Sequence, residues 1–137
     1  MVTVIDRLNE LLEAERAGVE TLSRLIPEAP DHAARTLFEQ VRDDEAWSCA
    51  GLARSIRTLG GALSDALGDF AAKVMAEPTL AARLKLLNRG QGWVARRLDG
   101  LIGETLPSDV TTFLTEMKRR HIVNIEACDR LAERLGG

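Results

Sequence analysis

Residues 4–26 read VIDRLNELLEAERAGVETLSRLI, and this stretch decides the fold class. Its apolar residues recur three and four positions apart, which places them on one face of an α-helix: Val4, Leu8, Leu11, Leu12, Val19, Leu22 and Leu25. Pro27 ends the helix, because proline cannot donate the next helical hydrogen bond. Glu15 falls within the apolar face. The stretch therefore predicts an amphipathic helix that turns one carboxylate toward the core.

Three further stretches have the same helical period, and they extend over about 31–59, 78–102 and 108–135. Asp31 and Ser108 are suited to cap the second and fourth helices, since their side chains can accept hydrogen bonds from free backbone N–H groups. No stretch alternates apolar and polar residues as a half-buried strand would. The chain is therefore predicted to be all-α.

The lengths of the connections predict how these helices are arranged. Short links divide the chain into two antiparallel hairpins, about 3–61 and 78–137, whereas the connection over about 62–77 is longer. That connection has room for a short helix and could carry the chain back along the first hairpin. We expect a single domain over 1–137, a four-helix bundle with its longer connection between helices two and three.

The two hairpins resemble each other in sequence. A shift of 76 lays residues 4–61 on 80–137 without a gap. Of these 58 positions, 12 are identical, and their members in the first hairpin are Arg7, Leu8, Leu11, Leu22, Leu25, Ile26, Glu28, Thr36, Arg54, Leu59, Gly60 and Gly61. Unrelated sequences of average composition give about four. We therefore expect an internal duplication.

Composition argues against several classes of protein. The chain is 45% hydrophobic and 28% charged, with a net charge of −3, so it has no basic footprint for nucleic acid. A membrane span would need about 18 consecutive apolar residues, and the sequence has no such run. Charges at Asp6 and Arg7 come too early for a signal peptide, and Cys49 and Cys128 match no zinc or redox spacing. We expect a cytoplasmic protein.

Each expected helix also turns one polar residue inward. Glu15 and Glu45 lie on the apolar faces of the first two helices, and Gln91 and His121 on those of the last two. The 76-residue shift pairs Glu15 with Gln91 and Glu45 with His121, which predicts one height for all four. A further equivalent pair lies three residues later, Ser48 and Asn124. Burying a carboxylate is costly unless it is paired or bound to metal, so two in one layer require a cation.

This arrangement resembles the ferritin-like superfamily, to which ferritin and rubrerythrin belong. The resemblance extends over nearly the whole chain and implies two hairpins joined by a long crossover. Its di-iron members carry Glu on helix one, Glu-x-x-His on helix two, Glu on helix three and Glu-x-x-His on helix four. Glu15 and Glu45 match the first two glutamates, whereas Ser48 and Gln91 stand in place of a His and a Glu. His121-x-x-Asn124 replaces the last motif, so the chain looks similar to small bacterial ferritin-like proteins with an incomplete ligand set.

Charge decides against a di-iron centre. Two divalent ions bring four positive charges, and Glu15 and Glu45 supply only two negative ones. One divalent ion would be neutralised, and with neutral His121 the two carboxylates form a three-ligand set for iron, manganese or zinc. Ser48, Gln91 and Asn124 are expected around the ion or as additional ligands. The interpretation is a protein with oxidase-type or metal-handling function, and whether it is an enzyme stays open.

Other interpretations use the same residues. A charged His121 between Glu15 and Glu45 would form a metal-free polar network, in which case the chain would be a non-enzymatic helical module that binds a partner, such as a second copy in a homodimer. A third interpretation is a small-molecule pocket in the core. Glycines inside the expected helices, at positions 18, 51 and 92, predict close approach of neighbouring groups.

Overall fold

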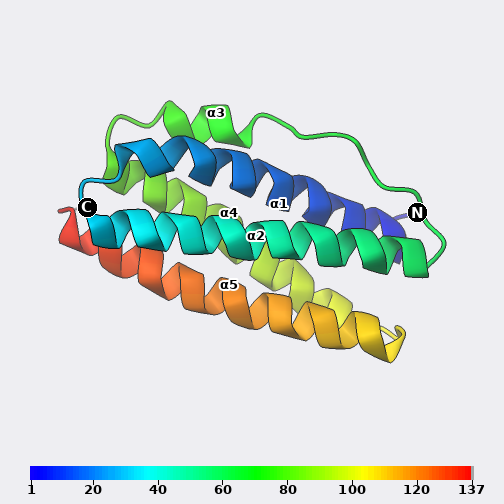
Figure 1. The fold of residues 1–137 in the computed structure, drawn as a ribbon. Helices are drawn as coiled ribbons and strands as arrows, with labels where there is room; N and C mark the ends of the chain where they lie inside the picture. The colour runs from blue at the N-terminus through cyan, green and yellow to red at the C-terminus, as the bar shows by residue number, and fades with distance from the viewer. Residues whose placement is uncertain (137) are drawn as a thin grey trace.

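The computed structural model describes residues 1–136 and is all-helical over that range, as predicted. Its long helices are α1 (Val4–Leu25), α2 (His32–Thr58), α4 (Leu80–Ile102) and α5 (Ser108–Arg134). A 3₁₀ turn, η1 (Ile26–Glu28), follows α1, and a short helix, α3 (Phe70–Met75), precedes α4 (Figure 1). Gly137, the last residue of the expected second hairpin, lies outside the described residues.

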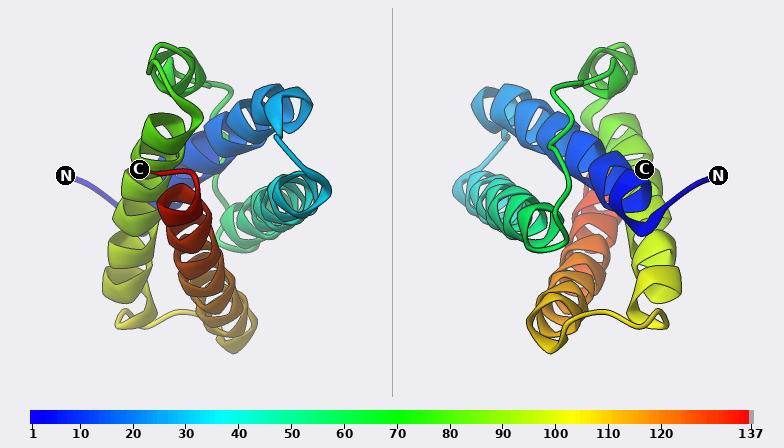
Figure 2. Two further views of the ribbon diagram at one scale, coloured as in Figure 1. Left: turned by 90° about the vertical axis from the view of Figure 1, so that its left-hand side faces the viewer. Right: turned by 90° about the vertical axis from the view of Figure 1, so that its right-hand side faces the viewer.

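The long helices form two packed pairs. α1 packs against α2, and α4 packs against α5. The end-on views of Figure 2 show that one pair is inclined to the other. After α2, residues 59–69 run back along α1 to α3, which packs on α1 and α4 (Figure 1). The connection therefore carries the chain back and holds a short helix, both as predicted.

Capping side chains define where most of the helices begin. Thr3 caps α1 through a reciprocal capping box with Asp6, and Asp31 accepts a hydrogen bond from the Ala34 N–H at the start of α2, as predicted. The prediction for Ser108 is wrong. Pro107 is the capping residue of α5, because its extended backbone (φ −54°, ψ 143°) already directs Ser108 into the first helical turn. The third expected helix likewise begins later than residue 78, at Leu80.

The helix bounds repeat at one spacing. α4 starts 76 residues after α1 (80 − 4), and α5 starts 76 residues after α2 (108 − 32) and ends 76 residues after it (134 − 58). The capping threonines Thr3 and Thr79 also differ by 76, and each accepts a hydrogen bond from the backbone N–H three residues on. The two halves of the chain therefore place their helix starts at equivalent positions, and the ends of α1 and α4 differ from this spacing by one residue (102 − 25 = 77).

A polar layer divides the core into two apolar clusters. One cluster includes Leu8, Leu52, Leu98 and Leu114, and the other includes Leu22, Phe38, Leu84 and Leu131. On each long helix, buried polar residues lie between the members of the two clusters: Glu15 on α1, Glu45 and Ser48 on α2, Asn88 and Gln91 on α4, and His121 and Asn124 on α5. The other buried polar residues, Thr21 and Ser55, donate their hydroxyls to backbone carbonyls of their own helices. The layer contains all the residues that the sequence singled out for chemistry.

Side chains of α1 and α4 fix both ends of the connection between α2 and α4. Asn9 on α1 donates to the Ala62 carbonyl and accepts from the Ser64 N–H, at 3.0 and 2.8 Å. Arg83 on α4 donates to the carbonyls of Met75 and Glu77, at 3.0 and 2.9 Å. The segment between these anchors therefore lies across α1 and α4.

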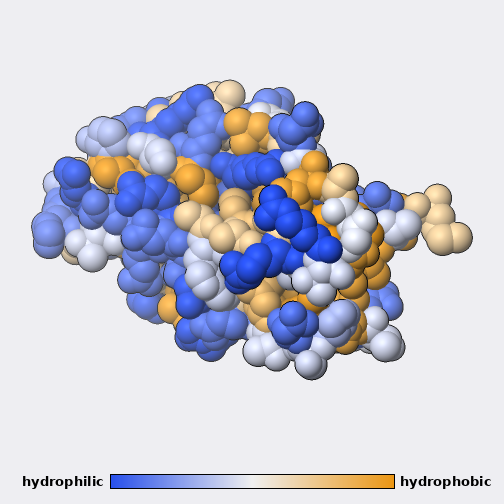
Figure 3. Space-filling model, turned by 45° about the vertical axis from the view of Figure 1, so that its right-hand side comes forward, coloured by the Kyte–Doolittle hydropathy of each residue, from blue (hydrophilic) through white to orange (hydrophobic). Residues whose placement is uncertain are grey.

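The surface carries both hydrophilic and hydrophobic side chains (Figure 3). Hydrophilic side chains predominate on the face in Figure 3, and hydrophobic ones reach the surface in separate patches. No helix in residues 1–136 combines the length and the apolar character that crossing a membrane would need.

The predicted close approach holds at Gly51, where α5 packs against α2. A Cβ atom there would lie 1.9 Å from Cε1 of Phe113, whose ring also packs on Trp47 with 5.0 Å between centroids. Because the ring is rigid, it could move aside only at a cost in folding free energy. A Cβ at Gly92 would meet only the end of the Arg96 side chain of the same helix, at 3.3 Å, so the prediction of a close helix approach is wrong at this position.

We expect Gly51→Ala to lower the free energy of unfolding by about 1–3 kcal/mol, because the methyl group overpacks the contact with Phe113. Gly92→Ala is the matched control and should raise stability by up to about 1 kcal/mol through helix propensity. Urea unfolding followed by circular dichroism measures both. Equal effects of the two substitutions would show that the Phe113 contact does not restrict Gly51.

Candidate metal centre

Three potential metal ligands from three helices converge in the polar layer. Glu15 on α1, Glu45 on α2 and His121 on α5 each offer one ligand atom, and these atoms lie within 4.8 Å of one another. Their side chains are almost completely buried, with exposed fractions of 1%, 4% and 2%. The sequence-based grouping of these three residues therefore corresponds to a real cluster in space.

Hydrogen bonding orients the imidazole of His121. Its Nδ1 lies 2.9 Å from the carbonyl oxygen of Met117, one turn earlier on α5. Since a carbonyl can only accept, Nδ1 carries the proton and donates it. In the neutral ring, Nε2 then has its lone pair free, and it lies 2.5 Å from Oε1 of Glu15. A backbone partner on one nitrogen with the other directed at carboxylates is typical of metal-binding histidines.

The layer also contains orphaned polar atoms. Within residues 1–136, the buried side-chain atoms without a hydrogen-bond partner are Oε1 of Glu15, Oε2 of Glu45, Oε1 of Gln91 and Nε2 of His121. The contact of Glu15 with His121 is close, but it lacks the alignment of a hydrogen bond. Buried polar groups are almost always satisfied in native proteins. Three of the four belong to the converging residues Glu15, Glu45 and His121, which indicates that a cation or a polar ligand belongs there.

Gly18 makes room for one of the carboxylates. A Cβ atom at this position would lie 2.0 Å from Oε2 of Glu45 and 2.6 Å from its carboxyl carbon. The glycine sits one turn after Glu15 on α1, so it lets α2 bring its carboxylate against the α1 backbone. The predicted close approach at Gly18 therefore serves the site itself.

Burial and neighbouring charge shift the pKa values of this cluster. Burial, followed by the charges of Glu15 and Asp44, raises the pKa of Glu45 well above its usual 4.5. For His121, burial alone would lower the pKa. The charge and close contact of Glu15, together with the Met117 carbonyl, outweigh burial and raise the pKa above 6.5. Without a further cation, the cluster therefore holds protons tightly.

The surrounding predicted residues differ in how they face the cluster. Gln91 lies beside it, with Nε2 donating to Oδ1 of Asn88 at 2.8 Å and Oε1 without a partner. Asn124 instead donates to Asp44 at 2.9 Å and accepts from Gln40 at 3.3 Å, so its polar atoms are engaged elsewhere. The hydroxyl of Ser48 donates to the Asp44 carbonyl at 3.0 Å. Of the three, only Gln91 presents a free ligand atom.

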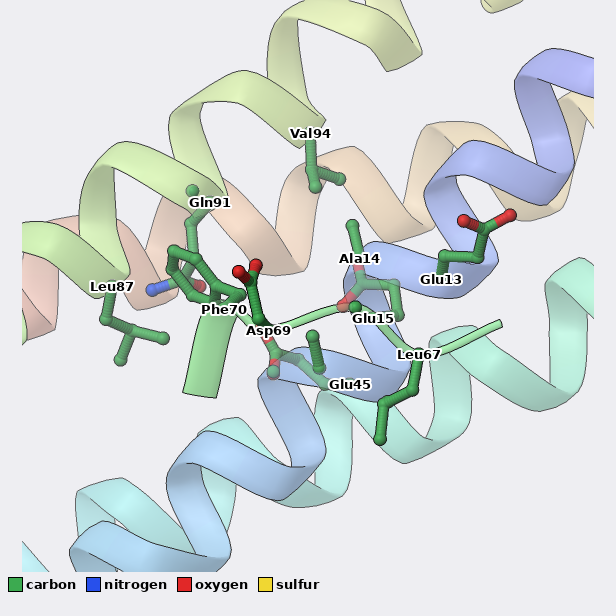
Figure 4. Close-up of a pocket in the computed structure, with 14 residues that line it drawn as sticks. Glu13, Ala14, Glu15, Glu45, Leu67, Asp69, Phe70, Leu87, Gln91 and Val94 are labelled. Carbon is green, nitrogen blue, oxygen red and sulfur yellow. The ribbon is translucent and has the colours of Figure 1, made fainter. Parts of the chain in front are cut away.

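A cavity opens from this layer toward the α1–α4 side of the molecule (Figure 4). Its volume is about 230 Å³, and Glu15, Glu45 and Gln91 line it. Residues 67–70, at the start of α3, lie across it. The potential ligands are thus buried from bulk solvent but adjoin a space that a small molecule could enter.

A family described as "Domain of unknown function (DUF6306)" matches residues 2–130. The chain belongs to this family. Neither curated proteins nor solved structures gave a match. The match extends over α1 to most of α5, so the whole polar layer lies within the DUF6306 domain.

The sequence analysis missed two polar residues near the cluster of this DUF6306 domain, Asp44 and Asn88. Asp44 accepts hydrogen bonds from Asn124 and Arg120, at 2.9 and 3.1 Å. Asn88 accepts a hydrogen bond from Gln91 and donates one to Asp129, the latter at 2.7 Å. Asn88 is three residues before Gln91, so it lies on the same helix face and could have been found by its spacing. Asp44 adjoins Glu45, and no periodicity distinguishes it from an exposed acid.

The cysteines of this DUF6306 chain do not join the ligand set. Burial, then the charges of Glu15 and Glu45, raise the pKa of the Cys49 thiol to about 12. Burial is also the main cause that raises the pKa of Cys128 to about 12. Because the thiolate is the form that binds metals, both sulfurs stay protonated and unreactive at neutral pH.

We expect the metal-free protein to lose stability as the pH rises. A proton binds Glu45 more tightly in the folded state, so its contribution is complete below the unfolded pKa of 4.5 and is lost as the pH passes the raised folded pKa. His121, with a pKa above 6.5, acts in the same direction. Each unit of pKa difference corresponds to about 1.4 kcal/mol.

Thermal unfolding in a chelator from pH 4.5 to 8 measures this loss, and Glu45→Gln is the reference. The variant should gain stability relative to wild type as the pH rises, because its amide carries no charge to bury. A constant difference between the two proteins across this range would show that Glu45 titrates normally.

Proposed function

We propose that this DUF6306 domain binds one divalent transition metal through Glu15, Glu45 and His121, for oxidase-type or metal-handling function. The observation that carries the proposal is the convergence of orphaned atoms from all three side chains on one buried point. A divalent ion there would satisfy them at once. It would also offset the two carboxylate charges that the apolar core otherwise destabilises.

The donor set suits iron, manganese or zinc. Two carboxylate oxygens and one imidazole nitrogen are ligands that these ions share, and fewer than four protein ligands leave coordination positions for water or a substrate. Bound iron or manganese would supply redox chemistry with oxygen. The protein's own part is to hold the ligands: Gly18 admits Glu45, and the Met117 carbonyl fixes the tautomer of His121.

We further propose that the fold is a ferritin-like four-helix bundle built from two duplicated hairpins. Support comes from the 76-residue spacing of the helix starts, of the ends of α2 and α5, and of the capping residues Thr3 and Thr79. The buried pairs Glu15/Gln91 and Glu45/His121 keep the same spacing. A cytoplasmic location is part of the proposal, and the free thiols of Cys49 and Cys128 are consistent with it.

Elemental analysis after equilibration with iron(II), manganese(II) or zinc(II) tests the metal site. We expect about one ion per chain, with affinity falling at least about 100-fold in Glu15→Gln, Glu45→Gln and His121→Ala, because each removes one of three ligands. Gly18→Ala should weaken binding as well, since its methyl group would displace the Glu45 carboxylate.

Asp43→Asn is the matched control, because Asp43 is a carboxylate of the same helix but exposed to solvent. It should leave metal binding unchanged. Circular dichroism establishes that each variant is folded. If folded wild-type protein takes up none of the three ions, the proposed metal site is wrong.

The contact between His121 and Glu15 favours a second candidate. A protonated His121 could pair with Glu15 and leave a metal-free network, as its raised pKa allows. The chain would then be a helical interaction module, and exposed Ile122 and Val123 on α5 offer an apolar surface to a partner or a second copy. Under this candidate, Glu45→Ala raises or barely changes stability, and sedimentation with Ile122→Lys tests the homodimer.

A further inference from the structure

The cavity beside the polar layer has an unusual combination of walls. Its sides are mainly apolar and are formed by Leu67 and Phe70 of the connection and by Leu87 and Val94 of α4. Small residues, including Ala14 on α1 and Gly90 on α4, leave the space open (Figure 4). Phe70 lies over Gly90, where an added Cβ would come within 3.0 Å of its ring. The cavity therefore suits a ligand with an apolar body.

All the charged groups in the lining are acidic. They are Glu13, Glu15, Glu45 and Asp69, and none of the described residues that line the cavity is Lys, Arg or His. Glu15 and Glu45 are buried at the inner end, whereas Asp69 is exposed at the connection. An anionic ligand would meet these carboxylates directly, since the cationic partners of Asp69 and Glu15, Lys73 and His121, lie outside the lining.

The inner end also lacks hydrogen-bond donors. Gln91 is 3% exposed, one N–H of its amide donates to Asn88, the amide also contacts the thiol of Cys128, and Oε1 has no partner. Oε2 of Glu45 is a second unpartnered acceptor in the same lining. A ligand that satisfies both must bring N–H or O–H groups.

The volume limits the size of the ligand. An apolar cavity of about 150 Å³ holds benzene, with six non-hydrogen atoms. In proportion, a cavity of about 230 Å³ holds about nine. Nucleotides, cofactors and long fatty chains are therefore too large.

We propose that this cavity binds a small primary amine, with its nitrogen at Gln91 and Glu45 and its apolar body against Leu67, Phe70 and Val94. An alkylammonium group brings three donors and a positive charge to an end lined by the carboxyl groups of Glu15 and Glu45 and the free Oε1 of Gln91, and its charge would favour the ionised form of Glu45. The inference deepens the proposed function and rests on it, because it takes the amine to be a ligand of the same site. Binding of the amine does not itself require the metal.

Calorimetric titration of the metal-free protein at pH 7 with hexylamine, hexanol and hexanoate tests the proposal. The three probes share a six-carbon body and differ in the head group. We expect hexylamine to bind at least tenfold more tightly than hexanol, and hexanoate to bind weakest. Hexanoate binding as tightly as hexylamine would overturn the proposal.

Variants locate the binding site. Ala14→Leu and Ala14→Phe fill the cavity and should weaken hexylamine at least tenfold, whereas Ala46→Phe, at an exposed position of α2 outside the lining, should not. Gln91→Leu should weaken hexylamine several-fold more than it weakens hexanol, because an ammonium loses more from a missing acceptor. If both folded Ala14 variants bind hexylamine like wild type, the ligand lies elsewhere and the proposal is wrong.

Zinc loading separates this proposal from the proposed function. If zinc binds and hexylamine binds neither form, the amine proposal fails and the metal site stands. If hexylamine binds and no metal does, the metal site fails and the amine proposal stands. Where both bind, the preference for hexylamine over hexanol should shrink in the loaded protein, because the ion takes up the charge of Glu15 and Glu45.

Discussion

The structure depends on one electrostatic constraint, the burial of two carboxylates in the middle of an apolar core. Glu15 and Glu45 are each at least 96% buried, and the nearest compensation within the described residues is the single imidazole of His121. Removing charges from water costs several kcal/mol per ion unless opposite charge and hydrogen bonds replace the lost solvation. The orphaned atoms show that side chains alone do not complete this replacement. A layer of this kind weakens an unliganded fold, so it is best explained by what it can bind.

The two halves of the chain contribute unequally to this layer. The first half supplies both carboxylates, and the equivalent positions of the second half hold Gln91 and His121, which are neutral or cationic. Gly18 leaves space for Glu45, whereas the equivalent position in the second half is Val94, whose side chain lines the cavity instead. With two carboxylates the layer carries at most two negative charges, which one divalent ion of the proposed site would balance.

Much of this could be predicted from the sequence, because helical period and burial are local signals. Glu15, Glu45 and His121 stood out as polar residues on apolar faces, and rigid helices of equal spacing place such residues at one height. The partners of Asn124 could not be predicted in the same way. The side chain of Asn124 could point to the cluster or to Asp44, to which it donates in the structure. The choice depends on its rotamer and on a rotation of α5 against α2 by less than one helical turn. A small-molecule pocket in the core was one interpretation of the sequence, but its position was not predicted, because part of its lining comes from residues 67–70, whose path follows from the anchors Asn9 and Arg83.

The two sides of the polar layer differ in what covers them. On the α2–α5 side, Asp44 accepts from Asn124 and Arg120, and the Arg120 guanidinium lies 3.7 Å over the ring of Trp47, so charged and aromatic groups close that side. On the α1–α4 side, the equivalent positions Ala14 and Gly90 are both small, and only the connection covers the space they leave. The carboxylates are therefore reached from the α1–α4 side, past Leu67 and Phe70, which line the cavity.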